Sequence, residues 1–164
     1  PVIIGRAYEN LSADILQLYS ATDIGGLFVD GFGDGVFIAA ENCGTLESVN
    51  HAAFGILQAS RTRISKTEYI SCPSCGRTLF DLQETTALIR SKTQHLKGLK
   101  IGIMGCIVNG PGEMADADYG YVGTGVGKIS LYKKHDVVKK DISMDEADTA
   151  LIELIKENGD WIDP

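Results

Sequence analysis

The stretch "KIGIMGCIVNGPGE" at Lys100–Glu113 decides how we expect the second part of the chain to fold. Its first five residues are mostly apolar and predict a short strand at Lys100–Met104. An earlier stretch, "EYISCPSCGR", predicts a similar strand at Glu68–Ile70, and the residues between them predict a helix at about Asp81–Leu96. Strand, helix and strand in this order are typical of an α/β layer.

Three cysteines follow these two strands. Cys72 and Cys75 form a C-x-x-C pair after the first strand, and Cys106 follows the second. Because neighbouring strands of an α/β layer end at a common edge, we expect the three thiols there. A C-x-x-C turn can hold one metal ion or two corners of a cluster, and Pro73 limits the freedom of the loop.

The segment "CIVNGPGE" adds a carboxylate to the three thiols. Gly110, Pro111 and Gly112 are predicted to turn the chain rather than continue a helix or a strand, which would return Glu113 to the side of Cys106. Four protein ligands can then be counted, and an iron–sulfur cluster normally takes four cysteines. An oxygen ligand at one corner would be held more weakly, which favours an enzyme over an electron carrier.

Three other interpretations of the cysteines remain open. "CPSCGR" is also typical of a zinc knuckle, although zinc ribbons normally bring a second C-x-x-C or a histidine pair. A ferredoxin-like electron carrier is a second alternative, and buried inert cysteines or a disulfide are a third. Cys43, in "ENCGTL", is interpreted as a small apolar filler.

The remaining motifs are assigned structural roles. "GYVGTGVGK" lacks the spacing of a phosphate-binding loop and predicts hairpin glycines. "KKHDVVKK" predicts a basic hairpin turn, with contact to an acidic electron donor as the alternative. The three histidines are predicted at surface or capping positions: His51, His95 and His135. Five aromatic residues are predicted to be core: Tyr19, Phe28, Phe32, Phe37 and Phe54.

The first part of the chain is also predicted to be α/β. We expect a helix at residues 9–20, strands at Leu27–Val29 and Val36–Ala40, and a helix at about Thr45–Ser60. A boundary is placed near Arg63–Lys66, so that residues 1–65 and 66–164 form two domains. At the other end, the capping-box spacing of Ser143 and Glu146 predicts a helix to about Asn158, and Gly159 suits its end.

Composition narrows the class of protein. Of the 164 residues, 44% are apolar and 23% are charged, values typical of a soluble globular protein of one or two domains. The net charge of -7 argues against a nucleic-acid partner, and no apolar run is long enough to span a membrane. Without a visible secretory signal, C-x-x-C favours a reducing compartment. A start without methionine leads us to expect a fragment or a processed form.

At these motifs a family resemblance is visible. "CPSCGRTLFDL" and "GCIVNGPGE", joined by a helix and a strand, closely resemble the iron–sulfur domain of the 4-hydroxy-3-methylbut-2-enyl diphosphate synthase family, which acts in non-mevalonate isoprenoid biosynthesis. The stretch "DIGGLFVDGFGDGVFIAAE" is similar to the segment before that domain, the end of a TIM-barrel-like unit. The resemblance therefore implies a terminal βα piece of a barrel at 1–65 and a compact cluster domain with a mixed sheet at 66–164.

The resemblance also implies an activity. Family enzymes reduce 2-C-methyl-D-erythritol 2,4-cyclodiphosphate by two electrons to (E)-4-hydroxy-3-methylbut-2-enyl diphosphate. It places the ligands of a four-iron four-sulfur cluster on Cys72, Cys75, Cys106 and Glu113. Glu113 would yield its iron to a substrate oxygen, and Asn109 is either a substrate contact or a turn-forming residue.

The partners implied are flavodoxin or ferredoxin as electron donor and a TIM barrel that this chain is too short to contain. Family members are commonly homodimers, in the bacterial cytoplasm or the plastid stroma. We therefore expect the fragment alone to be inactive, and an aerobically handled sample to lack the cluster.

Overall fold

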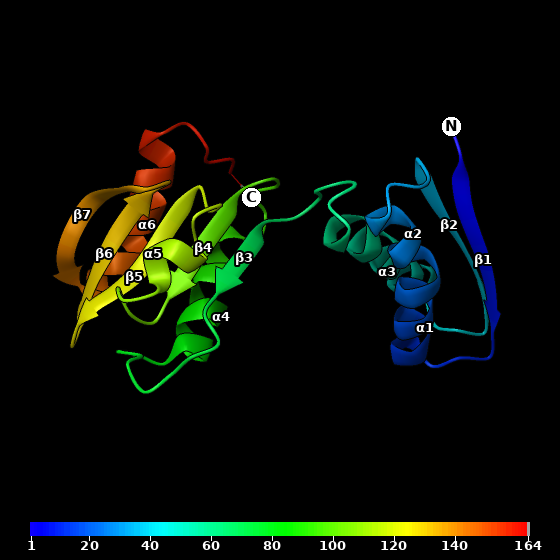
Figure 1. The fold of residues 1–164 in the computed structure, drawn as a ribbon, viewed down its shortest axis with the longest axis horizontal. Coiled ribbons are helices and arrows are strands. Elements are labelled where there is room, and N and C mark those ends of the chain that lie inside the picture. The colour runs from blue at the N-terminus through cyan, green and yellow to red at the C-terminus, as the bar shows by residue number, and fades with distance from the viewer. Residues whose placement is uncertain (164) are drawn as a thin grey trace. The chain divides into compact units, whose positions relative to one another are not determined.

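The computed structural model describes residues 1–163, which form two compact units (Figure 1). The first unit is Pro1–Ser65 and the second begins at Lys66. Among residues 1–163, no helix combines the length and the apolar character needed to cross a membrane.

The first unit contains a two-stranded parallel sheet covered on one side by helices. Strands β1 and β2 pair in parallel, from Ile3 opposite Gly35 to Glu9 opposite Glu41. Since parallel strands need a crossover connection, helices fill the link between them. The elements in chain order are β1 (Ile3–Glu9), α1 (Ala13–Ser20), the π-helix η1 (Ala21–Gly25), α2 (Gly26–Val29), β2 (Gly35–Glu41) and α3 (Leu46–Ala59).

The prediction of a strand at Leu27–Val29 is wrong. These residues belong to α2, because the helix that begins at Ala13 continues through η1 without a break. Four buried residues recur every four positions along this helix, a helical rather than a strand period: Leu16, Ser20, Ile24 and Phe28. Strand β1 was not predicted.

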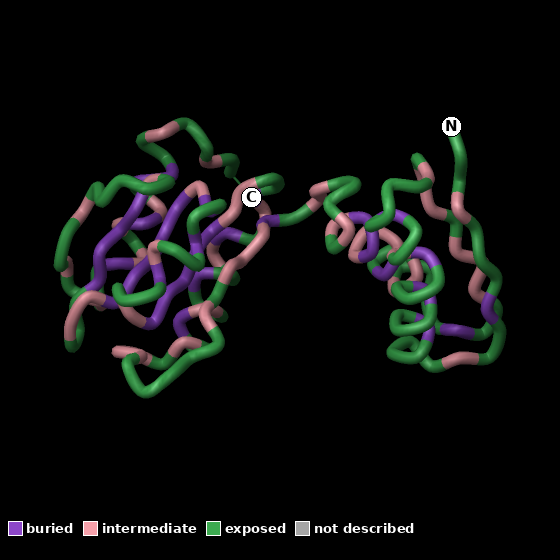
Figure 2. The backbone as a smooth tube through the Cα atoms, in the orientation of Figure 1, coloured by how far each residue is buried: buried purple, intermediate pink, exposed green. Residues whose placement is uncertain are grey.

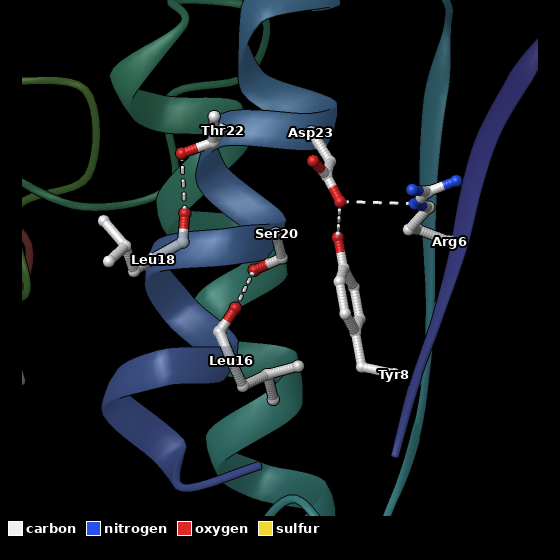
Figure 3. A network of polar contacts seen from close by, with 7 residues as sticks. All are labelled: Arg6, Tyr8, Leu16, Leu18, Ser20, Thr22 and Asp23. Atoms are coloured by element: carbon white, nitrogen blue, oxygen red, sulfur yellow. Dashed lines mark hydrogen bonds and ion pairs between the residues drawn. The ribbon is translucent and has the colours of Figure 1, made fainter.

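A small polar network attaches the π-helix to strand β1 (Figure 3). The carboxylate of Asp23 accepts hydrogen bonds from the Tyr8 hydroxyl at 3.0 Å and from Arg6 Nε at 3.2 Å. Burial of Tyr8, together with the neighbouring Asp23 carboxylate, raises the pKa of its hydroxyl to about 12. The Tyr8 hydroxyl therefore keeps its proton and donates it in the hydrogen bond to Asp23.

The predicted aromatic core of the first unit is only partly correct. Phe28 is buried, whereas Tyr19, Phe32 and Phe37 are 49%, 62% and 61% exposed. Phe37 lies on the face of β2 opposite the helices, since its neighbours Val36 and Ile38 are the ones that pack against them. Cys43 is fully buried beside Tyr8 and Leu16, which confirms its interpretation as a core filler.

The second unit is built on a five-stranded mixed sheet, which confirms the predicted α/β class. The strand order is β3-β4-β5-β6-β7; β3, β4 and β5 are parallel, and β6 and β7 are antiparallel to their neighbours. Its elements are β3 (Glu68–Ser71), α4 (Leu82–Thr93), β4 (Lys100–Met104), α5 (Gly110–Glu113), β5 (Tyr119–Gly125), β6 (Lys128–Lys133), β7 (Asp136–Ser143) and α6 (Met144–Glu157). The predicted hairpin at His135 and Asp136 joins β6 to β7.

Both faces of this sheet are covered. Helices α4 and α6 pack on one face, where Ile89 and Leu151 meet Ile103 and Tyr121. On the other face, Met114, which follows the short helix α5, packs against alternate strand residues such as Val122. The central strands are accordingly buried along almost their whole length (Figure 2).

Strand β5 was not predicted, because its glycines read as loop residues. The structure shows why glycine is needed there: a Cβ at Gly120 would lie 2.5 Å from the Met114 sulfur, and one at Gly123 would lie 2.6 Å from the Gly105 carbonyl oxygen. Gly127 occupies the turn to β6 with φ of +65°. The glycines of "GYVGTGVGK" therefore belong to a hairpin, as predicted, although the extent of its first strand was not.

Two helix ends of the second unit have recognisable capping residues. The Asp81 carboxylate accepts the Glu84 backbone N–H at 2.9 Å at the start of α4, and Gly159 follows α6 with φ of +77°. The predicted Ser143 cap is only partly correct: Ser143 occupies the N-cap position, but its side chain makes no capping hydrogen bond.

Candidate metal centre

The cysteine-bearing loops meet at one edge of the five-stranded sheet. Strands β3 and β4 are adjacent and parallel, so the residues that follow them share an edge. Cys72 comes directly after β3, and Cys106 lies two residues after Met104, the last residue of β4. The turn from β5 to β6 lies at the same edge because β5 is parallel to β4.

Gly105 joins the two loops. Its backbone N–H donates to the Cys72 sulfur at 3.3 Å, and its carbonyl oxygen accepts the Leu79 N–H at 3.0 Å. A Cβ at this position would lie 2.7 Å from Thr78 Cγ2, so a side chain larger than hydrogen would push the loop away. Because Gly105 directly precedes Cys106, its lack of a side chain lets the C-x-x-C loop pack closely against the Cys106 loop.

The C-x-x-C loop is folded by its own polar groups. Ser74, between the two cysteines, has φ of +67°, a conformation that non-glycine residues seldom adopt. Cys75 is exposed. Hydrogen bonds from the backbone and the guanidinium of Arg77 lower the pKa of the Cys75 thiol, which favours the thiolate form that binds metals.

Glu113 is carried by a single helical turn. The prediction that Gly110, Pro111 and Gly112 turn the chain rather than continue a helix is only partly correct, because Gly110–Glu113 form the single-turn helix α5. Proline is tolerated in the first turn of a helix, where its missing N–H would have no helical partner. Asn109 and Glu113 are both exposed, and the Glu113 N–H donates to the Asn109 carbonyl oxygen at 3.0 Å. The two residues are therefore one turn apart on the same side of the segment.

The cysteine loops share an edge, but the four expected ligands do not form a closed group. Within residues 1–163, no three His, Cys, Asp or Glu side chains stand in an arrangement ready for a metal ion. All four cysteines are free, and Cys72 and Cys106 are only partly buried. The disulfide and buried-inert alternatives therefore do not apply to Cys72, Cys75 or Cys106 in this structure.

The donor set nevertheless fits an iron–sulfur cluster in kind. Three unpaired thiols lie on the loops that follow β3 and β4, and the exposed carboxylate of Glu113 lies on α5, which follows the Cys106 loop. Fe–S clusters are held mainly by cysteine thiolates, and an N–H bond to a ligand sulfur, such as that of Gly105 to Cys72, is one of the groups that tune them.

A pocket of about 730 Å³ adjoins the C-x-x-C loop. Cys72, Ser74 and Thr78 line one side of it, and residues of α4 as far as Arg90 line the other. The Arg90 guanidinium lies over the Tyr69 ring at 5.3 Å. The histidines lie elsewhere: His95 Nε2 contacts the Ile162 carbonyl oxygen at 2.8 Å, and His51 and His135 are exposed. The pocket therefore adds mixed polar and apolar walls beside Cys72 but no histidine ligand.

Comparison with known proteins identifies the family of this chain. The family described as "GcpE protein C-terminal domain" matches residues 68–157, which include both cysteine loops and Glu113. The chain belongs to the GcpE family. The match begins at the first residue of β3 and ends at the last residue of α6, and thus covers the five-stranded sheet.

Curated relatives agree with the family match. The chain is 62% identical over 162 residues to the 4-hydroxy-3-methylbut-2-en-1-yl diphosphate synthase (flavodoxin) of Parabacteroides distasonis, covering 99% of the chain and 26% of the relative. It is 60% identical to the enzyme of that name from Porphyromonas gingivalis, covering 98% of the chain and 28% of the relative. The chloroplastic, ferredoxin-named synthase of Arabidopsis thaliana is 59% identical over 92% of the chain and 20% of the relative. The chain thus spans about a quarter of the length of these GcpE relatives.

Proposed function

We propose that the chain is the iron–sulfur part of a reductive enzyme of isoprenoid biosynthesis. The enzyme would convert 2-C-methyl-D-erythritol 2,4-cyclodiphosphate to (E)-4-hydroxy-3-methylbut-2-enyl diphosphate with two electrons. The observation that carries the proposal is the Gly105 N–H bond to the Cys72 sulfur, which links the C-x-x-C loop to the strand end that bears Cys106. The GcpE family match over the same residues supports it.

Cys72, Cys75, Cys106 and Glu113 are the proposed ligands of a four-iron four-sulfur cluster. When bound, such a cluster supplies electrons singly to a substrate held beside it. The cysteine loops would hold it from two neighbouring strand ends, and Arg77 favours the thiolate of Cys75 before binding. Glu113, with a carboxylate in place of a thiolate, is proposed as the exchangeable ligand that makes way for substrate.

Asn109 is proposed as a substrate contact. Its side chain makes no capping bond to α5 and is exposed, which leaves its amide available to a polar substrate group. It lies one helical turn before Glu113, so a substrate oxygen at Glu113 would have an amide within the same short segment.

Substrate turnover would need the rest of a longer protein. We propose that residues 1–65 are the end of a barrel-like domain and residues 66–164 the cluster domain, and that a separate TIM barrel binds most of the diphosphate. The names of the relatives support flavodoxin or ferredoxin as electron donor, and their bacterial and chloroplastic sources support the cytoplasm or the plastid stroma. We expect a homodimer and no nucleic-acid or membrane partner.

The proposal is tested by anaerobic reconstitution of the full-length protein with iron and sulfide. We expect about four irons and four sulfides per chain, as a cluster of this type requires. Cys106→Ser should lose both, whereas Cys43→Ser, which changes a buried thiol of the first unit, should retain them. One zinc per chain without sulfide would contradict the proposal and favour a zinc-ribbon-like interaction module.

A second variant separates an enzyme from an electron carrier. Glu113→Cys should keep the cluster, because it supplies the fourth cysteine that such clusters normally take. It should lose turnover of the cyclic diphosphate, because a thiolate is not readily displaced by a substrate oxygen. Full turnover in this variant would favour the ferredoxin-like carrier.

A further inference from the structure

Thr78 lies where the two cysteine loops meet. It is half-buried, three residues after Cys75 and immediately before Leu79, whose N–H is bonded to the Gly105 carbonyl oxygen at 3.0 Å. No part of the proposed chemistry requires a hydroxyl at this position. The contacts of Thr78 nevertheless reach both loops.

Toward the C-x-x-C loop, Thr78 makes a closed set of hydrogen bonds. Its Oγ1 accepts the Cys75 N–H at 3.1 Å, and its own N–H donates to the Cys75 carbonyl oxygen at 3.0 Å. The hydroxyls of Thr78 and Ser74 lie 3.1 Å apart. The Thr78 side chain therefore contacts both the backbone of Cys75 and the hydroxyl of Ser74, the residue with positive φ.

Toward the other loop, Thr78 packs on Gly105. Atoms Cγ2 and Oγ1 would lie 2.7 Å and 2.9 Å from a Cβ built on that glycine, so the side chain occupies the space that the missing Cβ leaves. Gly105 is bonded through its N–H to the Cys72 sulfur and covalently to Cys106. One threonine side chain thus contacts a residue that is tied to both of the other cysteines.

From these contacts we infer that Thr78 is a positioning residue that sets the place of Cys75 relative to the Cys72–Gly105–Cys106 junction. The inference rests on the proposed function, because positioning matters only if the three thiols act together. The hydroxyl fixes the Cys75 backbone, and the methyl group fixes the distance to Gly105. Serine would keep the first role and valine the second.

The test uses Thr78→Val and Thr78→Ser in the full-length protein. Thr86→Val is the matched control. The Thr86 hydroxyl makes a long contact, 3.4 Å, with the Ser71 hydroxyl, and this contact involves none of the three cysteines. The first measurement, on the protein without iron, is amide hydrogen exchange at Cys75. Loss of its acceptor should speed exchange about tenfold in Thr78→Val. Exchange in Thr78→Ser and Thr86→Val should match the wild type.

The second measurement is the rate at which a chelator removes iron from the reconstituted protein. We expect Thr78→Val to lose iron about tenfold faster, as for one lost hydrogen bond, with Thr78→Ser restoring the slow rate. If the wild-type protein binds the cluster and Thr78→Val matches it in both measurements, the inference about Thr78 is wrong, while the proposed function stands. A wild-type protein that takes up no iron and sulfide would overturn the proposed function, and the inference with it.

Discussion

The two sheets of the molecule differ in how completely they are covered. In the five-stranded sheet both faces are buried, as Ile103 on one face and Val122 on the other are fully inaccessible. Most residues of the two-stranded sheet are exposed or only partly buried (Figure 2). One face of it packs on helices, while Ile3 and Phe37 on the other are 68% and 61% exposed. Parallel strands normally have both faces covered. The comparison indicates that the second unit has a complete core of its own and the first does not.

The largest test of this comparison is to separate the units. Residues 66–164 alone should unfold in one cooperative transition, because their core includes both faces of the sheet. Residues 1–65 alone should show no such transition, because one face of the sheet lacks cover. Circular dichroism during heating measures both. A cooperative transition in the shorter piece would show that a single covered face is sufficient.

The next test removes the cover from one face of the five-stranded sheet. Met114 is 2% exposed and packs over Gly102 and Gly120, so Met114→Ala should lower the free energy of unfolding by about 3 kcal/mol. Val126→Ala, at a position that is 90% exposed, is the control and should change it little. Urea unfolding measures the free energy of unfolding of the two variants. Equal free energies would mean that Met114 does not stabilise this face of the sheet.

A third test, with a smaller expected effect, concerns the close contact between Gly105 and Thr78 at the edge of the five-stranded sheet. Gly105→Ala should lower the free energy of unfolding by about 2 kcal/mol and displace Thr78, because the added methyl group overlaps that side chain. Gly112→Ala is the matched control, since nothing lies within 4 Å of its Cβ position. Chemical denaturation should separate the two alanines, and a harmless Gly105→Ala would show that the loop can retreat without loss.

A pH-dependent test concerns the ion pair between Lys92 of α4 and Asp148 of α6, the two helices that pack on one face of the five-stranded sheet. Burial by itself raises the pKa of Asp148, but the Lys92 ammonium and the backbone hydrogen bonds to the carboxylate together outweigh burial and lower that pKa below 3.8. The stabilisation is therefore present above pH 3.8 and is lost as the pH falls through the lowered pKa. Asp148→Asn should cost less than about 1 kcal/mol at neutral pH, because the pair is partly exposed.

Urea unfolding at neutral and at strongly acidic pH measures this contribution. The difference between wild type and Asp148→Asn should shrink in acid, where the wild-type carboxyl group also becomes neutral. A difference that stays constant with pH would assign the effect to packing instead.

The smallest expected effect is on the uncovered face. Phe37→Ser should change the free energy of unfolding by less than about 0.5 kcal/mol, because the ring is mostly in solvent. Thermal unfolding of the chain is the measurement. A large loss would mean that the exposed ring is buried in solution, and that the two sheets are more alike than the structure shows.

Sequence reasoning succeeded where local patterns decide the structure. The strands before Cys72 and Cys106 and helix α3 follow from apolar runs and capping residues, and they lie where predicted. It failed at α2 and β5, where glycines read as breakers. At β5 the need for glycine comes from Met114 and from the Gly105 carbonyl oxygen, contacts between residues distant in sequence.

The candidate site was predictable in part for the same reason. Strand order brings the cysteine loops to one edge, as the β-α-β pattern predicts. The arrangement of the four ligands as a closed group does not follow from the pattern, and the structure does not show it. Thr78 was missed because its signal is a contact with Gly105; its spacing from Cys75 alone resembles an ordinary turn.

The bond between Gly105 and Cys72 joins residues 33 positions apart, with a whole helix between them. Contacts of such long sequence separation form after the intervening loop has closed, which is a slow step in the folding of parallel strands. Cys106 therefore joins the Cys72–Cys75 loop only when β3, α4 and β4 have assembled. Any metal or cluster would be loaded onto a nearly finished fold, and a newly made chain would pass through a stage in which its thiols are separate and exposed to oxidation.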